Sequence, residues 1–306
     1  MAASSYAVVI GGCNRDIGGH SLGPLVSKDS NPGFVSSSLG GVGRNIAHNM
    51  ALLGIPLQLL TALGSDDFTQ VVQSSCQSLG IGLAHALTVP GGTTSTYLYI
   101  CDANGDMELA VSDMAILDKL TPDYFKKQLS VLNGAQLVIT DTNIPAESLI
   151  WLCEHVTAPI FADPVSTVKA AKLAPVLGKL HTLKPNRLEA QLLSGVPIVD
   201  GTSLALAAQT LLATGLKQVF ITLGANGIYA ADAHSHLLLP ACPGALVNAT
   251  GCGDAGIAAI AWAHLQGLSL EESARAAVAA GSIAMESSDT INSSMCVSKL
   301  KARMNF

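Results

Sequence analysis

The sequence predicts an α/β protein with three α/β/α layers, in which helices cover both faces of a mainly parallel central sheet. From residue 135 onward, short apolar stretches alternate with helical patterns, an order typical of a parallel sheet. Polar residues follow these apolar stretches directly, at the strand ends where open α/β sheets bind ligands. Two stretches within about 93–112 instead alternate apolar and polar residues, which predicts half-exposed strands of a separate small β-lid.

Size and composition limit the classes of function. A length of 306 residues is enough for one large α/β domain or two ordinary ones, and the lack of a long linker favours a single domain over 1–306. Apolar residues make up 49% of the chain and charged residues 12%, so a large core is easily filled. The net charge of −6 argues against non-specific binding to nucleic acid. No apolar run approaches the roughly 18 residues of a membrane helix, so no membrane association is expected.

The cysteines and the N-terminus predict an intracellular protein. The seven cysteines form an odd number without a metal-binding Cys-x-x-Cys pair, so we expect reduced thiols. No secretory signal is visible at the start of the sequence. The cytosol is therefore the default compartment. An organelle such as the peroxisome would require a targeting signal outside these 306 residues, because the tripeptide at 298–300 is not terminal.

The first third of the chain predicts a buried strand, a glycine-rich helix start and the lid. Tyr6–Ile10 is a short apolar strand, and the polar residues Asn14 and Asp16 follow it. Asp16 is suited to accept hydrogen bonds from ligand hydroxyls, although an ordinary turn residue is about equally plausible on local grounds. Residues 18–39 predict a mobile flap or loose hairpin that joins the lid, and 44–53 predict a helix after Gly40-Gly41-Val42-Gly43.

The remaining elements follow from hydrophobic periodicity. A strand is expected at 57–63, a helix at 68–79, and a lid hairpin whose strands are 93–101 and 107–111. Strands are expected at 137–140, 160–162, 180–183 and 218–223, with helices near 146–156, 167–174, 187–194 and 203–213 between them. An antiparallel hairpin at 229–239 and helices near 253–266, 270–286 and after 296 complete the chain.

One stretch near the end of the chain has the residue types of an anion site with a base beside it. Gly251, Cys252 and Gly253 come directly before a long Ala-rich helix, so their N–H groups lie at a helix N-terminus that attracts anions. Asp254 stands in the first turn, where a carboxylate is suited to take a proton from an alcohol that attacks a phosphoryl group. The same residue types also occur at ordinary helix starts.

A second polar pair follows a strand in the middle of the chain. Asn186 and Glu189 are three residues apart at a helix start and therefore share one face. The pair is suited to orient Mg²⁺ through its water shell. The alternative is a capping box, in which Asn186 caps the helix and Glu189 bonds back to the backbone.

Four motifs in this order resemble the ribokinase-like (PfkB) sugar and nucleoside kinases over essentially the whole chain. The motifs span 40–47, 186–189, 222–227 and 250–254. The resemblance implies ATP-dependent transfer to a sugar hydroxyl, with Asp254 as the base and the N–H groups of 251–253 as the anion hole. It further implies that Asn186 and Glu189 organise Mg²⁺ and phosphate. By the same resemblance Asp16, Gly41 and Asn45 grip ribose hydroxyls, while Thr222, Gly224 and Gly227 lie along ATP.

Within that family, the stretches at 11–16, 31–33, 41–47 and 163–169 resemble those of the pseudouridine kinases. This implies a nucleoside substrate that is phosphorylated at its ribose 5′-hydroxyl. Asn14 joins the substrate residues, and Thr94, Thr96 and Lys169 are the candidates that face the base. A conventional nucleoside, ribose, or a catalytically weak nucleoside-binding role are the alternatives, but the last would be expected to lose Asp254 or its glycines.

Two further expectations concern a cation and a partner. Many family members carry Asp where this chain has Asn248, and that Asp helps to bind a monovalent cation, so activation by K⁺ is in doubt. The half-exposed lid strands, with Tyr97 and Tyr99, offer edges for pairing. We therefore expect a homodimer through the lid, and we expect the lid to close over the sugar and exclude water.

Overall fold

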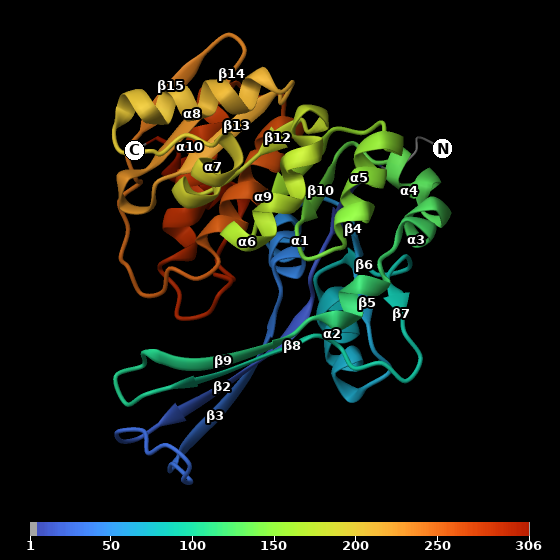
Figure 1. Ribbon diagram of the computed structural model, residues 1–306, viewed down its shortest axis with the longest axis vertical. Helices are drawn as coiled ribbons and strands as arrows, with labels where there is room; N and C mark the ends of the chain where they lie inside the picture. Colours follow the sequence, from blue (N-terminus) through green and yellow to red (C-terminus); the bar gives the residue numbers. More distant parts are fainter. Residues whose placement is uncertain (1–4, 306) are drawn as a thin grey trace.

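A computed structural model describes residues 5–305 and confirms the predicted fold class (Figure 1). Among these residues a nine-stranded sheet has the order β15-β14-β13-β12-β11-β10-β1-β4-β6. The seven strands from β13 to β6 are parallel, and β14 and β15 form the antiparallel hairpin at one edge. The strands are β1 (Ala7–Ile10), β4 (Leu57–Leu60), β6 (Ile81–Gly82), β10 (Val138–Asp141), β11 (Ile160–Asp163), β12 (Thr182–Leu183), β13 (Gln218–Thr222), β14 (Ile228–Asp232) and β15 (His236–Leu239).

Helices cover both faces of this sheet and enclose two apolar cores. One core includes side chains of α1 (Val42–Leu52), α2 (Asp67–Ser78), α9 (Cys252–Leu265), α10 (Leu270–Ala284) and α11 (Val297–Arg303). The opposite core includes side chains of η1 (Ala115–Lys119), α3 (Pro122–Lys127), α4 (Leu129–Asn133), α5 (Ala146–His155), η2 (Ala171–Lys179), α7 (Arg187–Ser194) and α8 (Gly201–Ala213). Continuous burial along the parallel strands explains why they read as short apolar runs rather than alternating ones.

The lid is a separate four-stranded sheet that projects from the body (Figure 1). Its order is β3-β2-β8-β9, with β2 (Asn14–Ser21), β3 (Gly33–Gly40), β8 (Thr96–Cys101) and β9 (Met107–Asp113). The expected hairpin at 93–112 is present, and the flap predicted at 18–39 is a regular antiparallel hairpin that already begins at Asn14. Asn14 and Asp16 therefore belong to a lid strand rather than to the loop after β1.

Some expected elements differ from the structure for local reasons. The strand predicted at 57–63 is two strands in different sheets, because β5 (Ala62–Leu63) leaves the main sheet and pairs with β7 (Leu87–Thr88). The helix expected at 167–174 is the short α6 (Thr167–Ala170), and Pro175 lies within the 3₁₀ segment η2 that continues it. The helices between 115 and 133 were not predicted.

Two further expectations can be compared with the described residues. All seven cysteines are free, as expected for reduced thiols. Within 5–305, none of the helices has both the length and the apolar character needed to cross a bilayer.

Candidate active site

The loop before α9 forms an open helix N-terminus. Gly251 has a φ of 84°, a left-handed conformation, and a Cβ there would collide with the Thr290 carbonyl. The helix begins at Cys252, and no side chain caps its first turn. The Cys252 N–H makes only a long contact of 3.4 Å with the Ala249 carbonyl. The start of the helix is therefore open to an anion, and the anion hole expected at 251–253 stays a prediction.

Asp254 lies in that first turn and contacts the glycine-rich helix start on the other side of the site. Its Oδ2 accepts a hydrogen bond of 3.0 Å from Nδ2 of Asn45, which α1 carries. Burial, reinforced by the nearby Asp163 carboxylate, raises the pKa of Asp254 to about 7, although Asn45 and Lys184 oppose the shift. Asp254 is thus poised to exchange a proton near neutral pH, which is the property of a general base.

The second polar atom of Asn45 has no protein partner. Asn45 is only 6% exposed, and its Oδ1 is buried without a hydrogen bond within the described chain. A buried amide oxygen without a partner costs about 1–3 kcal/mol. A ligand hydroxyl that donates to this oxygen would remove that cost, so Asn45 Oδ1 is a candidate acceptor for the predicted contact with a sugar.

A buried carboxylate, Asp141, ties the neighbouring loops together. Asp141 ends β10, and its Oδ2 accepts from the backbone N–H groups of Gly12 at 2.8 Å and Gly43 at 2.9 Å. Asn143 donates to both of its oxygens through its backbone N–H and its side-chain amide. Burial raises the pKa of Asp141, and these bonds oppose the shift. Asp141 directly follows the strand expected at 137–140, but the sequence does not indicate this function as a clamp.

The predicted sugar residues lie around this clamp. Gly41, with a φ of 97°, passes so close to Gly12 that a Cβ would meet its carbonyl. Asp16 receives a hydrogen bond from the Asn14 amide and lies over Gly40. Burial raises the pKa of Asp16 to about 6, while the bond from Asn14 and the charge of Arg44 oppose the shift.

The three candidates for base recognition differ in their surroundings. Lys169 donates from Nζ to Asn143 Oδ1 at 2.6 Å, so it is linked to the Asp141 clamp. Thr96 is half-buried at the start of β8 and donates to the Thr94 carbonyl. Thr94 is 2% exposed, and its hydroxyl bonds to Gly64, Asp66 and Thr69. These contacts favour a role for Thr94 in anchoring the lid strand rather than in touching a ligand.

Asn186 and Glu189 form the capping box that was the alternative interpretation. Glu189 Oε2 accepts from the Asn186 N–H at 2.8 Å, and Asn186 Oδ1 accepts from the Glu189 N–H at 3.0 Å. Within 5–305, no group of three or more His, Cys, Asp or Glu is arranged to hold a metal ion. A cation at this position would therefore take most of its ligands from water and from a bound phosphate.

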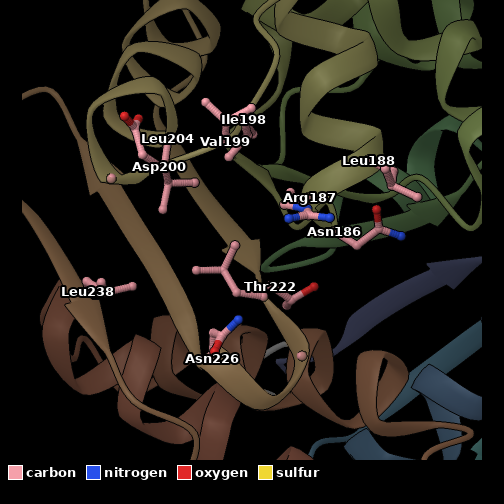
Figure 2. Close-up of a pocket in the computed structure, with 13 residues that line it drawn as sticks. Asn186, Arg187, Leu188, Ile198, Val199, Asp200, Leu204, Thr222, Asn226 and Leu238 are labelled. Atoms are coloured by element: carbon pink, nitrogen blue, oxygen red, sulfur yellow. The ribbon is translucent and has the colours of Figure 1, made fainter.

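Two cavities lie on either side of the turn after β13. The first, about 530 Å³, has Asn186 and Arg187 on one wall and Thr222 and Asn226 on another (Figure 2). The second, about 590 Å³, reaches from Thr222, Gly224 and Gly227 to Cys252 and Gly253 at the start of α9. Only the second of these two includes residues of the predicted anion site, and its volume suits a small-molecule ligand.

Asn248 and Lys184 complete the polar groups of the site. Asn248 donates to the Ser288 carbonyl and accepts from the Thr250 N–H, so both halves of its amide are engaged. Lys184, which directly precedes Pro185-Asn186, forms a buried ion pair of 3.0 Å with Asp163. Burial lowers the pKa of Lys184, but the carboxylates of Asp163, Asp254 and Glu189 together outweigh it and the net shift is upward, so the ammonium stays charged. Position after a strand is the sequence signal for Lys184, whereas Asp163 also begins the 163–169 stretch that resembles the pseudouridine kinases.

The fold and this arrangement of strand-end groups define a family of phosphotransferases. The family model for pfkB family carbohydrate kinases matches residues 4–295. The chain therefore belongs to the pfkB family of carbohydrate kinases, and the predicted family is confirmed.

Individual relatives agree with this assignment. The chain is 36% identical over 303 residues to the pseudouridine kinase of Escherichia coli, a match that covers 98% of this chain and 96% of that protein. A carbohydrate kinase from Agrobacterium tumefaciens superposes with a TM-score of 0.87 at 25% identity, covering 98% and 97% of the two chains. The ribokinase of Arabidopsis thaliana, solved with ribose and ATP, shares the fold with a TM-score of 0.88 at 23% identity over 99% of both chains.

Proposed function

We propose that this protein uses ATP to phosphorylate the ribose 5′-hydroxyl of pseudouridine, giving pseudouridine 5′-phosphate and ADP. The observation that carries the proposal is the similarity to a pseudouridine kinase over nearly the full length of both chains. The contact between Asp254 and Asn45 supports the chemical step, because it joins a candidate base to a candidate sugar-binding residue.

In the proposed reaction Asp254 takes the proton of the 5′-hydroxyl as the oxygen attacks the γ-phosphorus. A pKa of about 7 lets this carboxylate accept a proton near neutral pH. The N–H groups of Gly251, Cys252 and Gly253 hold the transferring phosphoryl group. Cys252 contributes its backbone rather than its thiol, whose pKa is raised by burial and by Asp254.

ATP would occupy the cavity between the turn after β13 and the start of α9. Thr222, Gly224 and Gly227 line one part of this cavity, and Cys252 and Gly253 line another. The acceptor would approach the phosphates at Gly253. Mg²⁺ bound to the phosphates would neutralise their charge. Asn186 and Glu189 would reach it through water, which fits a pair whose side chains are already engaged with the helix start.

The sugar would bind between the lid strand β2 and the start of α1. Asp16 and Asn14 approach from the lid, and Gly41 lets the ribose lie close to the backbone. The Oδ1 atom of Asn45, which lacks a protein partner, would accept a hydrogen bond from a sugar hydroxyl.

The uracil ring would lie toward Lys169 and Thr96. Lys169 offers further N–H donors to a carbonyl oxygen while it bonds to Asn143. Thr94 would support this wall from behind, because its hydroxyl is engaged within the protein.

We also propose that two copies associate through their lids. Both outer strands of the lid are exposed over most of their length. Six apolar side chains of this small sheet are exposed, and a second copy would bury them and pair with its outer strands. These side chains are Phe34, Val35, Leu98, Met107, Leu109 and Val111.

The test is an ADP-release assay with ATP and Mg²⁺ that compares pseudouridine, uridine, adenosine and ribose at equal concentration. Preference for pseudouridine, with phosphorus NMR placing the phosphate on the 5′-oxygen, would support the proposal. Preference for ribose or another nucleoside would keep the kinase class and overturn the substrate. A folded protein that binds pseudouridine but releases no ADP would indicate a catalytically weak relative.

A further inference from the structure

A buried lysine stands at the phosphoryl-transfer site without a role in the mechanism above. Lys184 follows β12 and is 5% exposed. Its Nζ lies 3.0 Å from Oδ2 of Asp163, the last residue of β11. Burying such a pair costs desolvation energy that the mutual attraction often only balances, so stability alone is a weak explanation for it.

The side chain of Lys184 lies along the first turn of α9. A Cβ added to Gly253 would be 3.4 Å from Lys184 Nζ, and one added to Gly256 would be 3.8 Å from its Cδ. Two positions without side chains on one face of this helix thus make room for the lysine. The ammonium group ends beside the backbone of Gly253, within the segment that forms the anion site.

The charges around Lys184 make this position unusual. A helix N-terminus carries a partial positive charge, so a cation beside it is unfavourable unless an anion joins them. Asp163 supplies one negative charge, and the carboxylates of Asp254 and Glu189 also act on the lysine. A phosphoryl group bound at the N–H groups of 251–253 would be the anion that lies against both the helix end and the ammonium.

We propose that Lys184 is a catalytic residue that stabilises the transferring phosphoryl group, and that Asp163 positions it. This inference rests on the proposed phosphoryl transfer but not on the identity of the acceptor. The acceptor oxygen bonds to the γ-phosphorus and gives its proton to Asp254. The bond from that phosphorus to the bridging oxygen breaks, and its electron pair leaves with ADP. Lys184 donates hydrogen bonds to the phosphoryl oxygens and transfers no proton.

The test removes the ammonium without changing the net charge of the site. In the double variant Lys184→Met with Asp163→Asn, no buried carboxylate is left without its partner. We expect kcat to fall about 100- to 1,000-fold, the range seen when one oxyanion-hole donor is lost. The KM for the acceptor and the Kd for ADP should stay within about threefold, since neither contains the transferring group. Lys184→Arg should retain more activity than the double variant.

A second readout separates catalysis from folding. ADP with aluminium fluoride and the acceptor mimics the transferring phosphoryl group, and the wild-type protein should bind it more tightly than ADP alone. We expect the double variant to lose this gain in affinity, measured by titration calorimetry. Lys179→Met, which removes an exposed ion pair with Glu154 outside the site, is the matched control and should change neither kcat nor this gain.

Two results would overturn the inference. One is a double variant that keeps kcat within fivefold of wild type. The other is a parallel loss of ADP affinity and thermal stability, which would make the pair structural. A wild-type protein that prefers ribose would overturn the proposed substrate and leave this test intact, because the comparison is then made with ribose.

Discussion

The two sides of the candidate site are built in different ways. The edge of the main sheet consists of buried polar groups that are already bonded to each other. Asp141 is fully buried with four donors, and Lys184 is paired with Asp163. The lid opposite is a single layer, and nearly every residue of β3 and β9 is exposed. The edge of the main sheet is therefore preorganised, whereas the lid exposes apolar side chains to water.

Because of this difference, substitutions on the two sides of the site should have different effects. Groups held rigidly at the sheet edge are suited to stabilise a transition state, because they need no reorganisation when charge develops. The lid gains contacts only when it closes on a substrate or meets another surface. Changes at the sheet edge should therefore reduce kcat or stability, and changes in the lid should act on acceptor binding and assembly. The following predictions test this division.

The largest effect is expected from Asp254→Asn. The amide keeps the size of the side chain but cannot take the proton, so kcat should fall about 100- to 10,000-fold. The Kd for the acceptor, measured by calorimetry, should change little, since Asn45 Nδ2 can donate to an amide oxygen as well as to the carboxylate. A variant within tenfold of wild-type kcat would refute Asp254 as the base.

Asp141→Ala should cost stability as well as activity. The change leaves the N–H groups of Gly12 and Gly43 buried without acceptors, at about 1–3 kcal/mol each. Urea denaturation should show at least about 2 kcal/mol lost, together with a higher KM for the acceptor because the loop at Gly41 loosens. Asp232→Ala is the control, since Asp232 also accepts from two backbone N–H groups but in the turn between β14 and β15. Equal losses in both variants would contradict a special role for Asp141.

The pH dependence of kcat/KM should follow the ionisation of Asp254, which lies on the preorganised side of the site. The base must be unprotonated, so kcat/KM should fall about tenfold per pH unit below the Asp254 pKa of about 7 and level off above it. The raised pKa means that the folded state prefers the protonated form. The contribution of Asp254 to stability is therefore full below its ordinary pKa of 3.8 and is lost as the pH rises from there through about 7. Asp254→Asn should therefore melt at a higher temperature than wild type at pH 8, with the difference vanishing near pH 4. A flat rate profile between pH 5 and 8 would count against this assignment.

The same division explains what the sequence predicts well. The parallel strands are buried on both faces, so their apolar runs and the polar residues after them identify the fold and the edge that carries the candidate site. The helix start at 251–254 is a local motif, and its geometry agrees with the prediction. Both features can be predicted because each depends on residues that are close together in the sequence.

Contacts between distant segments could not be predicted in this way. The Asp141 clamp joins residues 129 and 98 positions apart, and Lys184 meets α9 across the sheet edge. Thr94 has the alternating pattern of an exposed strand, yet it is buried by residues 25 to 30 positions away. Burial by another segment leaves no trace in the local pattern.

The lid should respond through assembly rather than chemistry. Leu109→Glu places a charge on an apolar, 64% exposed position of β9. If two lids pair, light scattering should show dissociation, the KM for the acceptor should rise several-fold, and kcat should change less than about threefold. Leu206→Glu, on the exposed side of α8, is the control. A protein that is monomeric before the change would refute the lid dimer.

The smallest effect is expected from monovalent cations. Asn248 lies in the loop before α9, and its amide bonds to Thr250 and Ser288 rather than offering a carboxylate. Exchange of K⁺ for Na⁺ at constant ionic strength should therefore change kcat by less than about twofold, a difference near 0.4 kcal/mol at most. Asn248→Asp adds the missing charge while keeping an acceptor for the Thr250 N–H, so it should increase the dependence on K⁺. Strong activation of the wild-type protein by K⁺ would contradict this prediction, because backbone carbonyls would then bind the cation without a carboxylate. A bound K⁺ would in that case be part of the preorganised side of the site.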